Sequence, residues 1–95
     1  MKLISISPSS KADKKYMAKF QTDTGRTKTT HFGAAGYDDY IKSKNEVKKA
    51  AYIARHKVNE NFSDPTTAGA LSRWVLWNKP TLSASIADYK SRFNL

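Results

Sequence analysis

The sequence predicts an α+β fold, in which an N-terminal antiparallel β-hairpin or small meander is followed by three packed α-helices. Thr, Ser and other β-forming residues are frequent in residues 1–33, whereas helical patterns fill residues 43–93. The chain has 95 residues, the size of one domain. We therefore expect a single compact domain over residues 1–95, with residues 1–12 as a peripheral strand or a flexible arm.

An alternating segment over residues 14–22 predicts the hairpin. Asp23-Thr24-Gly25 follows as a turn in which Gly25 can adopt a positive φ. A three-residue loop there pairs Phe20 with Lys28, whereas a two-residue loop would scatter the apolar groups over both faces. We expect the longer loop because the buried face sets the register. The face expected to be buried carries Tyr16, Ala18, Phe20, Thr30 and Phe32.

Capping signals divide the remaining chain into three helices. Ser43 and Glu46 form a capping box that predicts the start of the first helix. Asp64-Pro65 suits the N-cap and first position of a second helix over residues 66–77, which is apolar nearly all round and should be buried. Asn78-Lys79-Pro80 ends it.

Apolar spacing predicts which helix faces are buried. The stripe of the first helix consists of Val47, Ala50, Ala51, Ala54 and Val58. In the second helix Leu71 and Val75 should lie in the core, with Trp74 and Trp77 either packed there or at a protein interface. The stripe of the third helix consists of Leu82, Ile86, Tyr89 and Phe93.

Charge and composition narrow the classes of function. The formal net charge of +9 favours an anionic partner, which is nucleic acid, anionic lipid or an acidic protein. Cysteine is absent, which excludes disulfides, thiolate zinc sites and cysteine nucleophiles. No signal-peptide core and no membrane-spanning apolar run are found, so we expect a soluble intracellular protein without a membrane partner.

Several long segments resemble a known family. They are Lys14-Lys15-Tyr16 with Phe20, residues 31–40, Arg55-His56, residues 67–79 and residues 85–94. These segments are similar to small basic proteins encoded by giant viruses with large DNA genomes, the mimiviruses, marseilleviruses and their relatives. Lys44-Asn45 and Phe62 depart from that pattern. The resemblance implies a shared fold and a viral origin, hence a place in the virion, in the viral factory of the host cytoplasm or in the nucleus. It brings no catalytic residues with it.

Two basic blocks supply 8 of the 9 net charges, one in residues 1–20 and one in residues 41–60. On the first helix, Lys44, Lys48 and Arg55 fall within an arc of about 40°, with Tyr52 on its flank. Such a stripe suits phosphate contact and stacking on a base, although cations also simply solvate a helix face. The candidate nucleic-acid-binding residues are Lys14, Lys15, Lys19, Arg26, Lys28, Lys44, Lys48, Lys49, Tyr52 and Arg55.

Other candidate sites have simpler structural interpretations. Gly33-Ala34-Ala35-Gly36 could bind an anion through its amides, but it more simply turns the chain between strand and helix. Asp38-Asp39 could hold Mg²⁺, but it more simply caps a helix. His31 and His56 lack the spacing of a zinc site. The sequence therefore predicts no catalytic residue, no metal and no cofactor.

The sequence thus favours a non-enzymatic protein that binds nucleic acid through phosphates, with little sequence preference and with DNA favoured over RNA. Its expected role is packaging or organisation of viral DNA. The alternative is a structural or interaction protein of the virion, which binds an acidic protein partner or forms a homodimer through its Trp-bearing helix.

Overall fold

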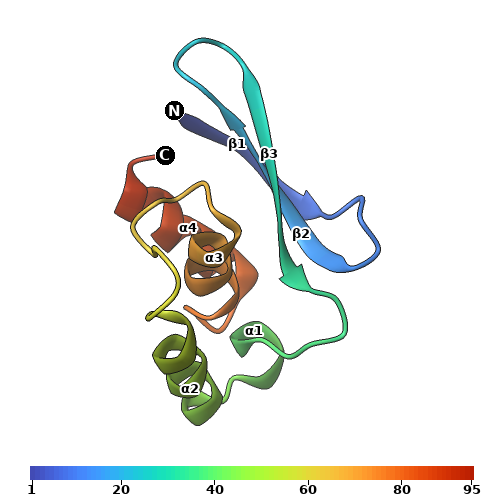
Figure 1. The fold of residues 1–95 in the computed structure, drawn as a ribbon, viewed down its shortest axis with the longest axis vertical. Coiled ribbons are helices and arrows are strands. Elements are labelled where there is room, and N and C mark those ends of the chain that lie inside the picture. Colours follow the sequence, from blue (N-terminus) through green and yellow to red (C-terminus); the bar gives the residue numbers. More distant parts are fainter.

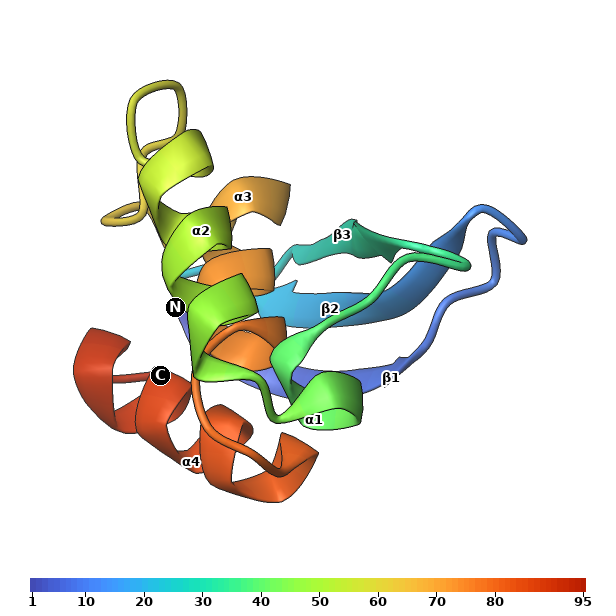
Figure 2. The same ribbon diagram turned by 90° about the horizontal axis from the view of Figure 1, so that it is seen from below.

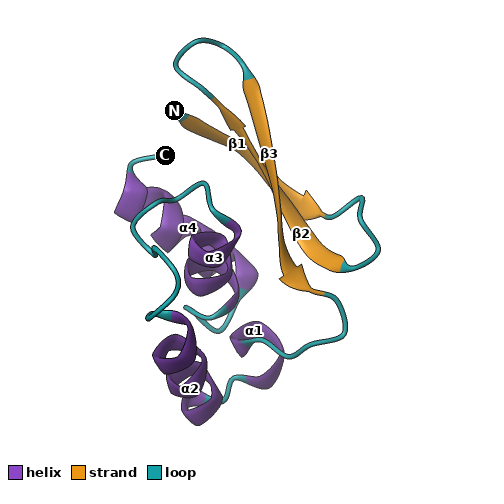
Figure 3. Ribbon diagram, viewed as in Figure 1, coloured by secondary structure: helices purple, strands orange, loops and turns teal.

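Three antiparallel strands form one twisted sheet in the computed structural model, which describes residues 1–95 (Figures 1 and 3). The strands are β1 (Lys2–Pro8), β2 (Lys14–Gln21) and β3 (Thr27–Ala34), in the spatial order β1-β2-β3. The fold is α+β, as the sequence predicts. Of the two expected forms, a hairpin or a small meander, the structure has the meander, because residues 2–8 pair with β2 as an edge strand.

The register of the β2–β3 hairpin is confirmed. Phe20 pairs with Lys28 and Tyr16 pairs with Phe32, as the three-residue loop requires. The amide of Thr22 donates to the carbonyl of Arg26 at 2.8 Å, and Gly25 lies in the left-handed region at φ +84°. Only this register gathers the aromatic residues on one face, so burial of that face selects it.

The helices follow the sheet, and the later ones in the chain lie against one of its faces (Figures 1 and 2). They are α1 (Tyr40–Ser43), α2 (Glu46–His56), α3 (Ala68–Leu71), the π-helical turn η1 (Ser72–Leu76) and α4 (Leu82–Phe93). None of them is both long enough and apolar enough to cross a bilayer. The opposite face of the sheet, which carries Met17 and Lys19, has no helix against it.

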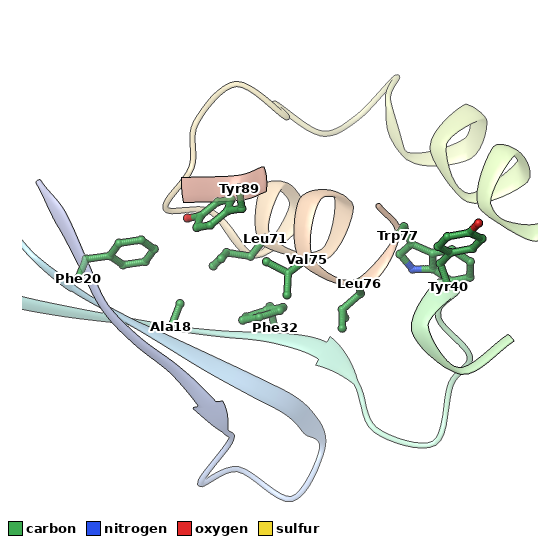
Figure 4. Close-up of a cluster of buried hydrophobic side chains, with 9 residues drawn as sticks. All are labelled: Ala18, Phe20, Phe32, Tyr40, Leu71, Val75, Leu76, Trp77 and Tyr89. Atoms are coloured by element: carbon green, nitrogen blue, oxygen red, sulfur yellow. The ribbon is translucent and has the colours of Figure 1, made fainter. Parts of the chain in front are cut away.

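The core lies between the sheet and the α3–η1 and α4 helices (Figure 4). Phe20 and Phe32 from the sheet, Leu71 and Val75 from the helical layer, and Tyr89 from α4 are all fully buried. Tyr16 and Ile86 are partly buried against this cluster. The predicted aromatic face of the hairpin and the predicted stripe of the last helix therefore both face the core.

The predicted start of the first helix is wrong. Ser43 ends the short helix α1, and Lys44 then adopts a left-handed conformation at φ 50° that separates α1 from α2. The N-cap of α2 is Asn45, whose side chain accepts hydrogen bonds from the amides of Val47 and Lys48. Glu46 does not complete a capping box, because it accepts a hydrogen bond from the Tyr40 hydroxyl.

The predicted buried stripe of α2 is also wrong. Val47 is 79% exposed and Val58 is 74% exposed, and no residue of α2 is fully buried. Of the predicted stripe only Ala51 is partly buried. The other α2 residues that face the rest of the molecule are Lys49, Tyr52, Ile53 and His56. Tyr52 stacks on another aromatic ring there, and Lys49 donates a hydrogen bond. These two contacts, and not the burial of small apolar side chains, set the orientation of α2.

The second predicted helix is shorter and less regular than its pattern. Asp64 accepts hydrogen bonds from the amide and hydroxyl of Thr66, which closes a turn, and the helix begins after Thr67 caps the amide of Ala70. Its second half is a π-turn, in which the amide of Trp77 reaches the carbonyl of Ser72 at 3.0 Å. Hydrophobic periodicity carries no signal for either feature.

Replacing Leu71 by Ala should lower the free energy of unfolding by about 2–5 kcal/mol, because the substitution leaves a cavity at a fully buried position. The matched control is Val47→Ala on the exposed side of α2, which should change it by less than about 0.5 kcal/mol. Urea denaturation measures both values. Equal losses in the two variants would contradict this placement of the core.

Candidate functional site

The main cleft of the molecule lies between the end of the sheet, helix α2 and the α3–η1 helix. Its volume is about 730 Å³. Gly33 lies on its sheet side, where a Cβ atom would approach within 2.7 Å of Leu76 Cδ1. The glycine therefore permits the close contact between strand and helix that closes the inner end of the cleft.

The cleft brings together half of the predicted binding residues. Those that line it are Lys14, Lys15, Lys48, Tyr52 and Arg55. The first two come from β2 and the other three from one face of α2, so the fold joins the two basic blocks that the sequence keeps about 30 residues apart. Each of the five nevertheless has a different environment.

Lys15 is committed to the fold. Its Nζ atom lies 2.6 Å from Asp39 Oδ2, and the two side chains are only 12% and 5% exposed. Asp39 also caps α1 by accepting a hydrogen bond from the amide of Lys42 at 2.8 Å. A lysine held in this way is not available to a phosphate, so the structure argues against Lys15 as a binding residue.

The other cations of the cleft are accessible. Lys48 pairs with Asp38 at 2.9 Å, but both side chains are open to solvent, and such pairs are weak. The hydrogen bond from Lys48 lowers the pKa of Asp38. Lys14 and Arg55 form no ion pair at all. The cleft therefore offers two unpaired cations and a third that a stronger anion can capture.

Three aromatic rings form a stack along the α2 side of the cleft. The Tyr52 ring lies 4.7 Å from Trp77 and 4.1 Å from His56, nearly parallel to both. Its two faces are therefore covered, and the prediction that Tyr52 stacks on a base is not supported. Burial raises the pKa of the Tyr52 hydroxyl. The open end of the stack is His56.

The remaining predicted residues lie outside the cleft. Lys19 is on the opposite face of the sheet and Arg26 is at the β2–β3 turn. Lys28 donates to the Thr66 hydroxyl, and Lys44 donates to the carbonyl of Ile41. Lys49 donates to the carbonyl of Asn78 at 2.7 Å and lies over the Tyr40 ring, so its role is to hold α2 in place.

The other candidate sites are used within the chain. In the segment Gly33–Gly36, the amide of Ala35 donates to the carbonyl of Asp13, so the segment turns the chain and does not form an open anion nest. Asp39 caps α1, as expected. No group of three His, Cys, Asp or Glu side chains lies close enough together to hold a metal ion.

Sequence reasoning missed two contributors to the cleft, His56 and Trp77. His56 follows Tyr52 by one helical turn, and this i, i+4 aromatic spacing was the available signal. The sequence held no signal for the orientation of Trp77, because the π-turn Ser72–Leu76 adds a residue to the helical turn before it.

Comparison with known proteins adds a family. Residues 4–56 match the model of the family of unknown function DUF5754, which is more than half of the chain. The chain belongs to DUF5754. The matched segment includes most of β1 and all of β2, β3, α1 and α2. It therefore contains β2 and α2, the two elements that carry the cations of the cleft. No curated protein and no solved structure matches the chain.

Replacing Asp39 by Asn should lower the free energy of unfolding by about 3–5 kcal/mol, because it leaves the charge of Lys15 buried without a partner. Asn preserves an acceptor for the amide of Lys42, so the cap is retained and the ion pair alone is tested. Asp38→Asn is the control: it breaks an exposed pair and should leave the stability nearly unchanged. Similar denaturation midpoints for the two variants would contradict this role of Asp39.

Proposed function

We propose that this DUF5754 protein is a non-enzymatic nucleic-acid-binding protein that contacts phosphates in the cleft between β2 and α2. The observation that carries the proposal is the gathering of Lys14, Lys48 and Arg55 around one cleft. Only three of the 17 Lys and Arg side chains form an ion pair with a carboxylate, so most of the positive charge is available to an external anion.

The chemistry of these side chains favours binding with little sequence preference. Lys and Arg neutralise phosphates, which position a nucleic acid but carry no sequence information. Lys44 precedes α2 and is exposed, so a backbone that follows the α2 side of the cleft could meet about four cations.

The proposal extends to the biological setting. The resemblance to giant-virus proteins supports a role in packaging or organising viral DNA, in the virion or the viral factory, and favours DNA over RNA. A catalytic role has less support, because Asp39 is engaged by Lys15 and the amide of Lys42, and Asp38 is engaged by Lys48.

The alternative proposal is an interaction protein of the virion. Two exposed apolar residues favour it, Val47 on α2 and Val58 just beyond the end of that helix. The Trp-bearing helix favours it less, because Trp77 is 8% exposed and Trp74 is covered by Arg73 and Arg92, whose guanidinium carbons lie 4.1 and 3.9 Å from its ring. Binding to nucleic acid that does not weaken with salt, or no binding, would favour this alternative.

Binding to a DNA duplex of arbitrary sequence should weaken steeply with salt. With about four phosphate contacts, log K should fall against log salt with a slope of about −3.6, because each contact releases condensed counterions. The double variant Lys48→Ala/Arg55→Ala should flatten that slope by about two units for every sequence tested. Fluorescence anisotropy at several salt concentrations measures it.

The matched control is Lys79→Ala/Lys90→Ala, which removes the same charge from exposed positions outside the cleft. It should keep a slope close to that of the unmodified protein. If both double variants lose affinity equally, the binding depends on net charge alone and the cleft is not its site.

A further inference from the structure

We propose that the cleft holds an unpaired nucleotide of a single strand, with its base against the ring of His56 and its phosphate between Lys14 and Arg55. This inference rests on the proposed function and specifies the form of nucleic acid that the cleft accepts.

The size and shape of the cleft favour one nucleotide. Its volume of about 730 Å³ falls within the range of sites that enclose a small organic molecule. Bases in a duplex are stacked inside the helix and cannot reach a concave site unless they leave the stack. An unpaired nucleotide can place both its base and its phosphate in the cleft.

The aromatic stack supplies a surface for the base. Trp77 forms its buried end and Tyr52 its middle, and both faces of Tyr52 are occupied. The side chain of His56 is 41% exposed and lines the cleft, while Tyr52 covers one face of its ring. The other face can accept a base, which would become the fourth ring of the stack.

Two cations line the same cleft as His56 and can take the phosphate. Arg55 is the neighbour of His56 on α2, and Lys14 reaches the cleft from the facing strand. Neither has an ion pair to break. Two carboxylates oppose this charge in the cleft: Asp38 pairs with Lys48, and Glu60 lies 3.9 Å from His56 Nδ1. Neither pairs with Lys14 or Arg55, so these two cations remain available to the phosphate.

The test compares three probes of equal length, about 10 nucleotides, which is within the site sizes of single-strand binders. The first is a thymidine strand, the second an abasic strand with the same phosphates and no bases, and the third a blunt duplex. The thymidine strand should bind about tenfold more tightly than either of the others, because only it offers an unpaired base.

A pair of variants locates the base. His56→Ala should weaken binding of the thymidine strand about tenfold and weaken binding of the duplex by much less, because the duplex offers no unpaired base to the ring. His56→Phe keeps an aromatic ring at that position and should restore it. The comparison of thymidine and abasic strands uses the unmodified protein, so it tests the site even if a His56 variant does not fold.

The outcomes separate this inference from the proposed function. Equal affinities for thymidine strand, abasic strand and duplex would overturn the single-nucleotide site and leave phosphate binding intact. Absence of binding to all three probes would overturn both.

Discussion

The buried ion pair between Lys15 and Asp39 is the contact on which the geometry of the cleft depends. It joins β2 to the start of α1, at a place where both side chains are withdrawn from water. Breaking such a pair is costly because either charge left alone remains poorly solvated. Since Asp39 also caps α1, one carboxylate fixes both the position and the start of that helix. The pair thereby fixes where α1, which leads into α2, lies against β2.

Helix α2 is held by few contacts, and these contacts determine what it presents. Tyr52 stacks on Trp77, and Lys49 donates to the carbonyl of Asn78. Asn78 is itself buried and donates to the carbonyl of Trp74 and to Asp88, which fixes the connection between η1 and α4. With Tyr52 and Lys49 turned inward, the helical period places Lys48 and Arg55 toward the cleft. The same orientation of α2 therefore both anchors the helix and exposes its cations in the cleft.

The sequence was sufficient to predict the sheet and α4, because each buries one face against the core and the spacing of its apolar residues identifies that face. The pairing of Phe20 with Lys28 and the burial of Tyr89 follow directly from such patterns. It was insufficient for α2, because Val47 of the predicted stripe is exposed on that helix and Val58 is exposed just beyond its end. There the specific stacking of Tyr52 on Trp77 outweighs the weak preference of small side chains for burial. The two basic blocks of the site could be predicted from the sequence. That Lys15 is held in a buried ion pair while its neighbour Lys14 is accessible could not, because this difference depends on tertiary contacts.

The most direct test of the central claim, that the cleft between β2 and α2 is the nucleic-acid-binding surface, is an NMR titration of isotope-labelled protein with a thymidine strand. We expect the backbone signals of Lys14, Arg55 and His56 to shift in proportion to bound strand, while those of Lys19 and Thr29 on the opposite face of the sheet remain in place. Shifts confined to the opposite face of the sheet, with the signals of the cleft unchanged, would contradict it.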